Sequence, residues 1–216
     1  MKTGTGLLYL VALLIVTALP TPPVAGAQPL PHLWSRSFGD DAEDSAGSVV
    51  VDDEGNLFIT GWFRGSIDFG GGPLISAGTR DIYLAKLDAN GNHIWSRRFG
   101  DADHQIAVTL AVNSLGQPVI AGSFMGSVDF GLGNHTSAGG WDLFVAKFNE
   151  NGVPLWTRSY GDAEDQIGAG VGVGSGGAVC VTGHYRGSVG FGGGALPSAG
   201  GYDIFLFRLD SSSGFH

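Results

Sequence analysis

Short apolar runs recur along this chain between polar, glycine-containing turns, and no stretch keeps the 3.6-residue apolar spacing of a helix. In the first unit the run Ser48–Val51 is followed by an acidic turn at Asp52–Asn56 and a second run at Leu57–Phe63, a pattern typical of a β-hairpin. A long loop rich in Gly and Pro comes next, which we expect to hold at most one short strand. The runs Ile82–Leu87 and His93–Phe99 then predict a third and a fourth strand.

The same four-run pattern occurs three times without a gap. Its starting segment, Trp-Ser-Arg-Ser-Phe-Gly-Asp at Trp34, returns with small changes at Trp95 and at Trp156, so each step is 61 residues. Repeats of this kind bury one another's faces when they stack. The repeat units run over residues 34–94, 95–155 and 156–216.

Four antiparallel strands in 61 residues match one blade of a β-propeller, in which each sheet covers the face of its neighbour. Large aromatic residues recur at three positions of every unit, and they can fill the space that widens between adjoining sheets. We therefore predict an all-β fold, a partial β-propeller of three four-stranded antiparallel blades. The recurring aromatic residues are Trp34, Trp95 and Trp156; Phe63, Phe124 and Tyr185; and Phe69, Phe130 and Phe191.

Three blades are fewer than the roughly four to eight of closed propellers, so we expect an open array with two exposed edges. The segment His32–Phe38 predicts a fourth-type strand that has no partners of its own, whereas the last unit ends with its third strand. Two interpretations stay open. The chain is a short member or a piece of a longer array, or two copies form a homodimer in which each opening strand completes the other copy's final blade.

Three segments of the unit carry a family resemblance. They read Trp-Ser-Arg-x-Phe-Gly-Asp, then Val-x-x-x-x-Gly-Asn-Leu-Phe-Ile-Thr-Gly, then Asp-Ile-Tyr-Leu-Ala-Lys-Leu-Asp. Together they resemble the bacterial SBBP repeat, a family named for β-propellers, and the resemblance covers about residues 33–216. It implies an exported propeller-type protein, often surface-associated and mostly of undefined function. It carries over no catalytic residue.

The amino terminus has the order of a secretory signal peptide: a charged start at Lys2, an apolar run at Leu7–Leu19 and the small residues Ala25–Ala27. We predict a signal peptide at 1–27 and a repeat domain at 28–216. The apolar run is shorter than the roughly 20 residues of a membrane span, so we expect no span after cleavage. The predicted location is secreted, periplasmic or at the cell surface.

Cys180 is the only cysteine, so no disulfide can form within one chain. Its repeat equivalents are Phe58 and Val119, which predicts a small buried hydrophobic side chain at Cys180. An intermolecular bridge is the alternative.

Acidic residues outnumber basic ones by 20 to 11, which gives a formal net charge of −9 and disfavours nucleic acid as a partner. Carboxylates gather on the loop that opens each unit. Oxygen-rich loops can hold Ca²⁺, whereas the alternative is a set of turn residues that hydrogen-bond their own backbone. The Ca²⁺ candidates are Asp40, Asp44, Asp101, Asp103, Asp162 and Asp165. Asp81, Asp142 and Asp203, one before each third strand, are expected to cap turns.

Residues that break the repeat are further candidates for chemistry. His104, His135 and His184 have no histidine at the equivalent positions of the other units, but their spacing matches no metal motif. The run Gly172–Gly177 contains a GxGxxG pattern, but strand-forming residues follow it, so we interpret it as a hairpin turn without a phosphate cradle.

Close repetition without a divergent acid, base or metal cluster favours a binding protein over an enzyme. The predicted function is that of an exported non-enzymatic module that binds a protein or glycan, or serves structurally, at the cell envelope or outside the cell. The alternative is a propeller enzyme, a hydrolase or lyase, with acidic residues or histidines near the axial channel.

Overall fold

The computed structural model describes residues 31–212 and residue 214, so the predicted signal peptide lies outside the described residues. The chain divides into two units, residues 1–33 and residues 34–216, and every strand named below belongs to the second. The described residues form strands, turns and loops without a helix. The all-β prediction is therefore confirmed.

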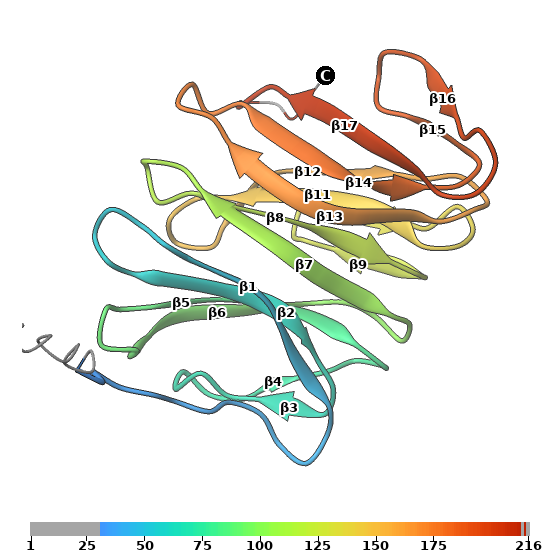
Figure 1. Cartoon of the computed structure of the whole chain (residues 1–216). Helices are drawn as coiled ribbons and strands as arrows, with labels where there is room; N and C mark the ends of the chain where they lie inside the picture. Colours follow the sequence, from blue (N-terminus) through green and yellow to red (C-terminus); the bar gives the residue numbers. More distant parts are fainter. Residues whose placement is uncertain (1–30, 213, 215–216) are drawn as a thin grey trace, which may run out of the picture. The chain divides into compact units, whose positions relative to one another are not determined.

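Most strands belong to three antiparallel sheets, none of which closes on itself (Figure 1). The first sheet has the order β1 (Asp44–Val51), β2 (Leu57–Phe63), β5 (Asp81–Leu87) and β6 (His93–Phe99). The second sheet has the order β7 (Gln105–Val112), β8 (Pro118–Phe124), β11 (Asp142–Phe148) and β12 (Pro154–Tyr160). The third sheet has the order β13 (Gln166–Val173), β14 (Val179–Tyr185) and β17 (Asp203–Leu209). The first two sheets thus have the four strands expected, and the third has three.

The loop between the second and third strand of each sheet is a hairpin of its own, where the sequence predicted at most one short strand. In the first hairpin the Asp68 carboxylate accepts hydrogen bonds from the amides of Gly70 and Gly72, at 2.7 and 3.0 Å, and so closes the turn. These local bonds let a segment with few apolar residues form strands. The hairpins pair β3 (Ser66–Ile67) with β4 (Leu74–Ile75), β9 (Ser127–Asp129) with β10 (Asn134–Thr136), and β15 (Ser188–Gly190) with β16 (Ala195–Pro197).

A β-bulge interrupts the first strand of every sheet. In the second sheet the register shifts between Ala107 and Thr109, opposite Gly122 of β8. A Cβ on Gly122 would lie only 2.0 Å from the carbonyl oxygen of Ile106, so only glycine fits there. Gly61 and Gly183 occupy the same place in the other two sheets. In the first sheet β1 begins at Asp44, four residues before the predicted start at Ser48, and the bulge lies within this additional part of the strand.

The sheets pack face to face, with the second between the first and the third (Figure 1). One hydrophobic cluster joins the first and second sheets, and another joins the second and third sheets. Trp95 of β6 is buried in the first of these clusters, and Trp156 of β12 is buried in the second. The expectation that large rings lie between adjoining sheets is confirmed for these residues.

The prediction of a strand at His32–Phe38 is wrong for this structure, because these residues have no strand assignment. A strand needs a neighbour to pair with, and in the described part of the chain the segment has none. Trp34 nevertheless lies against the first sheet, since its indole Nε1 donates to the carbonyl oxygen of Ala89 at 3.0 Å.

The prediction that Cys180 is buried is also wrong, because its side chain is exposed. Phe58 and Val119, the equivalent residues, are fully buried. They lie on the faces of the first and second sheets that the next sheet covers, whereas Cys180 lies on the outer face of the third sheet.

Candidate functional site

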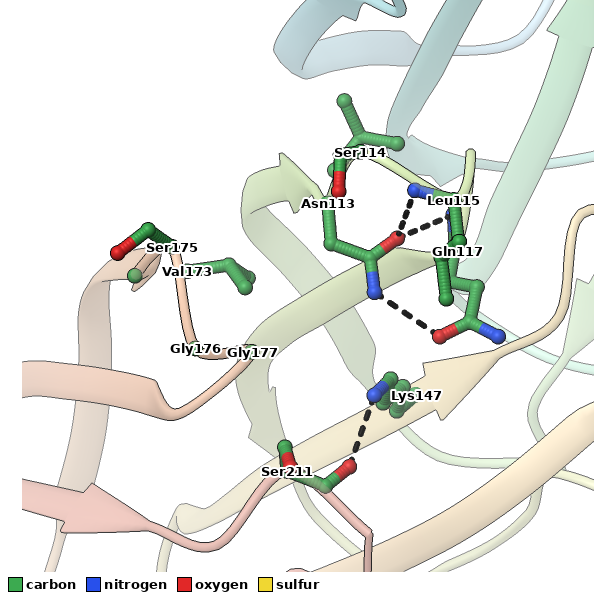
Figure 2. A pocket seen from close by; sticks show the side chains of 12 residues that line it. Asn113, Ser114, Leu115, Gln117, Lys147, Val173, Ser175, Gly176, Gly177 and Ser211 are labelled. Carbon is green, nitrogen blue, oxygen red and sulfur yellow. Dashed lines mark hydrogen bonds between the residues drawn. The ribbon is translucent and has the colours of Figure 1, made fainter.

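A groove of about 450 Å³ opens between the second and third sheets, at the end where their hairpin turns lie (Figure 2). Two turns form its walls, Asn113–Gln117 between β7 and β8 and Gly174–Gly177 between β13 and β14. Lys147 of β11 and Ser211, which follows β17, also line it. The groove therefore draws on segments from across the sequence that the stacking of two sheets brings together.

Internal hydrogen bonds fix the Asn113–Gln117 turn. The side-chain oxygen of Asn113 accepts from the amides of Leu115 and Gln117, at 3.0 and 2.9 Å, and its Nδ2 donates to Gln117 Oε1 at 2.9 Å. A polar side chain that bonds its own turn in this way holds the backbone in one conformation. Ser114, Gln117 and Ser175 also line the groove, and among the described residues the two hydroxyls and Gln117 Nε2 make no hydrogen bond.

Lys147 is the cation of this groove. Its side chain is buried, and its Nζ donates to the carbonyl oxygen of Ser211 at 2.8 Å, as Figure 2 shows. Burial lowers the pKa of Lys147 below its ordinary value, and the nearby negative charge of Asp210 opposes this effect in part.

The equivalent lysine in the first sheet has a different environment. Lys86 Nζ lies 3.4 Å from Oδ2 of Asp52, a carboxylate on the β1–β2 turn. Asn113 takes the place of Asp52 in the second sheet, so the turn beside Lys147 carries no charge. The sequence analysis did not single out Lys147. The sequence does hold a signal for it, because the first two units share the lysine but differ at the turn, which has Asp52 in the first unit and Asn113 in the second.

The groove at the equivalent position between the first and second sheets has the opposite character. It is smaller, about 210 Å³, and its lining includes Asp52, Asp53, Glu54 and Glu150 together with Lys86. None of the residues that line the larger groove is acidic. Two sites at the same place in the repeat thus differ in charge, and only the larger one favours an anionic or polar ligand.

Three of the predicted calcium ligands, Asp40, Asp101 and Asp162, share one place in the repeat. Each carboxylate accepts the amide two residues ahead and the amide that begins the following small hairpin. In the second unit Asp101 accepts from the amide of Asp103 at 2.9 Å and from the amide of Ser127 at 2.7 Å. These bonds tie the opening loop of each unit to its hairpin.

The pKa of each of these three carboxyls is lowered. For Asp40 the hydrogen bonds from the amides of Ala42 and Ser66 are the main cause. For Asp101 and Asp162 burial raises the pKa, but the hydrogen bonds they accept outweigh burial and the net shift is downward.

The other three calcium candidates occupy different positions. Oδ1 of Asp44 accepts the amide of Arg64 at 3.4 Å, and burial raises the pKa of Asp44. Asp103 accepts at its backbone carbonyl from Thr79 Oγ1, at 2.7 Å. Asp165 accepts from the amide of Trp141 at 3.1 Å and from the hydroxyl of Tyr202 at 2.8 Å. Across residues 31–212 and 214, no three His, Cys, Asp or Glu side chains gather in a way that could hold a metal ion. The calcium site stays a prediction.

The aspartates before the third strands cap turns, as predicted. Asp81 and Asp142 each accept the backbone amide four residues before them, at 2.9 and 3.0 Å. Arg98 also donates to Asp81. In the second unit Ser159 takes the place of Arg98. Burial raises the pKa of Asp142.

The three repeat-breaking histidines have separate partners. His104 Nδ1 lies 3.0 Å from Thr79 Oγ1, and the rings of His184 and Tyr202 are 5.0 Å apart. His135 bonds Thr157 Oγ1 at 2.8 Å, and burial lowers the pKa of His135. The GxGxxG run contains the end of β13 and the turn to β14, which confirms the prediction of a hairpin.

The fold and groove define the class of this protein as an all-β repeat of stacked antiparallel sheets. No family model matches the chain. The chain is similar to the regulatory protein FlaEY of Caulobacter vibrioides, to which it is 30% identical over 146 residues. This stretch is 66% of the present chain and 15% of FlaEY, so the chain spans only a small part of that relative. No helix in the described sequence is long and apolar enough to cross a membrane.

Proposed function

We propose that this chain is an exported, non-enzymatic repeat protein of the β-propeller type, with SBBP-like repeats, that acts as a binding module at the cell envelope or outside the cell. The stacked sheets and the 61-residue repeat support the propeller assignment. The signal-peptide pattern at 1–27 supports export. FlaEY is a bacterial protein with a regulatory role by its name, and we carry over no more from it than the similarity of one segment.

The groove beside Lys147 carries the binding proposal. A buried lysine whose neighbouring turn is neutral can give its remaining N–H donors and its charge to a ligand, while Lys86 is engaged by Asp52. Ser114, Ser175 and Gln117, which line the same groove, carry hydroxyl and amide groups that can donate to a ligand. The ligand that fits this chemistry is a protein or glycan segment bearing a carboxylate, since the charge-assisted hydrogen bond to Lys147 would be its strongest contact.

Binding is tested with two matched pairs of probes. Oligogalacturonate is compared with its methyl ester, and a short polyglutamate is compared with polyglutamine. We expect the carboxylate member of one pair to bind, and Lys147→Gln to weaken that binding about tenfold, the loss of one charged hydrogen bond. Equal binding of both members of the pair that binds, or no binding of any probe, would overturn the assignment.

Two further variants sharpen this test. Asn113→Asp places a carboxylate beside Lys147, as Asp52 lies beside Lys86, so it should also weaken binding of the anionic probe. Arg208→Gln is the matched control, because Arg208 is the repeat equivalent of Lys147 but is exposed and lies outside the groove. It should bind the probe like the parent protein.

Export is tested separately by fractionating bacteria that express the full chain and a variant without residues 1–27. We expect the full chain to be found outside the cytoplasm, with its mass reduced by that of residues 1–27. A full chain that stays in the cytoplasm at its full mass would overturn the export proposal.

A further inference from the structure

The outer face of the third sheet exposes residues that are interior elsewhere in the molecule. Ile204 and Leu206 of β17 are 82% and 73% exposed. Their equivalents in the first two sheets are all 0% exposed, because the next sheet covers them; these are Ile82 and Leu84 in β5 and Leu143 and Val145 in β11. Exposed Cys180 of β14 lies on the same face. The third sheet therefore presents the same apolar surface that the first and second sheets bury, without a cover in the described chain.

The first sheet presents the complementary surface at the other end of the row. Val49 and Val51 of β1 are 59% and 57% exposed, whereas Leu110, the equivalent of Val49 in β7, is 5% exposed against the first sheet. A hollow of about 440 Å³ lies over this face, lined by Val49, Ile59 and Phe69 among others. The first sheet thus carries the surface that the second and third sheets use to pack on the sheet before them.

The segment Trp34–Phe38 already lies where an outer strand of a preceding sheet would lie. Trp34 Nε1 donates to the carbonyl of Ala89, in the same way that Trp95 Nε1 donates to Glu150 at 3.0 Å. Phe38 packs on the Phe69 ring with the centroids 4.9 Å apart, and the equivalent pair in the next unit is 5.1 Å apart. The segment has the contacts of β6 and β12 but no strand pairing, so its backbone can accept a partner strand.

The outer edge of β17 lacks the strand that would pair with it. In the first and second sheets the third strand pairs with a fourth, β5 with β6 and β11 with β12. Within the described residues β17 pairs only with β14. The missing neighbour is a strand of the type that Trp34–Phe38 resembles in sequence.

From these surfaces we propose that two copies of this chain associate end to end. The outer face and free edge of the third sheet of each copy receive the first sheet and the segment Trp34–Phe38 of the other copy. The first and third sheets lie at opposite sides of the row of sheets (Figure 1), so the exposed surfaces of one copy do not cover each other. In the proposed pair a second copy covers both of them. Both joints then repeat the packing that already joins the sheets within one chain, and the pair closes a ring of six sheets, within the roughly four to eight of closed propellers.

The existing contacts between sheets also predict a backbone hydrogen bond between the two copies. Between the first two sheets the amide of Gln105 donates to the carbonyl of Arg80, at 2.8 Å, and between the second and third the amide of Gln166 donates to Trp141, at 2.6 Å. Asp44 is the repeat equivalent of Gln105 and Gln166. The amide of Asp44 should therefore donate to the carbonyl of Tyr202 in the other copy.

The test measures the mass of the purified chain by analytical ultracentrifugation over a concentration series, together with the reaction rate of Cys180 with a thiol reagent. We expect twice the chain mass, and a Cys180 rate that falls at least tenfold once the pair forms, because Cys180 lies in the joint. A single-chain mass with a constant Cys180 rate at every concentration would overturn the proposal, and so would open polymers of more than two copies.

Charged variants on the two surfaces provide the decisive comparison. Ile204→Lys with Leu206→Lys blocks one surface, and Val49→Lys blocks the other, so each variant alone should be a single chain. Their mixture retains one intact joint and should form a two-chain complex. Leu132→Lys, at an exposed leucine of the β9–β10 turn, is the matched control and should pair like the parent. Variants that remain paired alone, or a mixture that does not pair, would contradict the proposal. This outcome is independent of probe binding at Lys147.

Discussion

Trp95 of the first sheet donates its indole N–H to the carbonyl oxygen of Glu150, in the turn between β11 and β12 of the second sheet, at 3.0 Å. The ring is 7% exposed, so one side chain supplies both apolar burial and a hydrogen bond at the joint between two sheets. Trp156 makes the same kind of bond to Ser211, at 3.3 Å, between the second and third sheets.

We expect Trp95→Phe to lower the free energy of unfolding by about 1–3 kcal/mol, because it leaves the Glu150 carbonyl without its donor and removes part of a buried ring. Urea unfolding followed by circular dichroism measures the change. Trp34→Phe is the matched control, since Trp34 is 37% exposed, and its effect should be smaller. Equal losses from the two substitutions would contradict a joint built on the buried indole.

Gly122 gives a second prediction, on the bulge. Gly122→Ala would place a methyl group 2.0 Å from the carbonyl oxygen of Ile106, so the strand or its neighbour must move. We expect a loss of at least about 2 kcal/mol in the free energy of unfolding, in the range of strongly overpacked sites. Gly172→Ala, in β13, meets no atom within 4 Å and should change the stability little. Comparable stability of the two variants would show that the bulge tolerates a side chain.

The periodic part of the architecture was predictable from the sequence because it depends on spacing. The hairpin of β1 and β2, the third strand β5 and the fourth strand β6 follow from apolar runs and turn residues in one unit, and the repeat transfers them to the next. The extra hairpins were not predictable in this way, since residues such as Asp68 stabilise them through turn bonds rather than through an apolar pattern.

The ends of the array and the groove were harder to predict for another reason. Burial of a repeated position depends on whether a neighbouring sheet covers it. Equivalence in the sequence predicts for Cys180 the buried environment of Phe58 and Val119, but it does not show that the third sheet lacks such a neighbour in the described chain. The groove depends on two turns and Lys147 meeting across a joint, so no single motif contains it. Comparing the units position by position, rather than searching for motifs, would have pointed to Asn113.

Asp101 predicts how stability depends on pH in acid. Its pKa in the folded protein is below the ordinary 3.8, so the folded state favours the ionised carboxylate. The stabilisation is therefore complete above about pH 4 and is lost as the pH falls through the lower pKa of the folded protein. We expect Asp101→Asn to cost about 1–2 kcal/mol near pH 6, through weaker hydrogen bonds to Ser127 and Asp103, and progressively less as the pH falls below the ordinary pKa of 3.8.

Unfolding measured by urea at several pH values between about 2 and 7 tests this dependence on Asp101. The difference between parent and variant should shrink towards acid. Asp142 provides the contrast, because burial raises its pKa and the cost of its ionised form is relieved as the pH falls. A difference between the parent and Asp101→Asn that stays constant with pH would show that the carboxylate charge of Asp101 does not contribute to stability.

Tyr83 and Tyr160 make the fourth prediction, at alkaline pH. Burial raises the pKa of both phenols from 10.0 to about 12, with a smaller upward contribution at Tyr83 from the charge of Asp44 and an opposing one at Tyr160 from Arg158. Between pH 10 and about 12, both phenols therefore stay protonated in the folded protein, whereas they would be ionised in the unfolded chain. The stability they give is therefore full below pH 10 and declines as the pH rises from 10 through about 12.

Ultraviolet absorbance of the phenolate follows this titration directly. We expect two tyrosines of the folded chain to ionise only near pH 12, and Tyr83→Phe to remove one of these two while keeping an aromatic ring against Phe69, whose centroid lies 5.1 Å away. Unfolded in urea, the same chain should titrate all its phenols near pH 10, the ordinary value. If the folded protein also titrates all of them near pH 10, then Tyr83 and Tyr160 are open to water, and the packing of β5 and β12 against the neighbouring aromatic rings is looser than the structure describes.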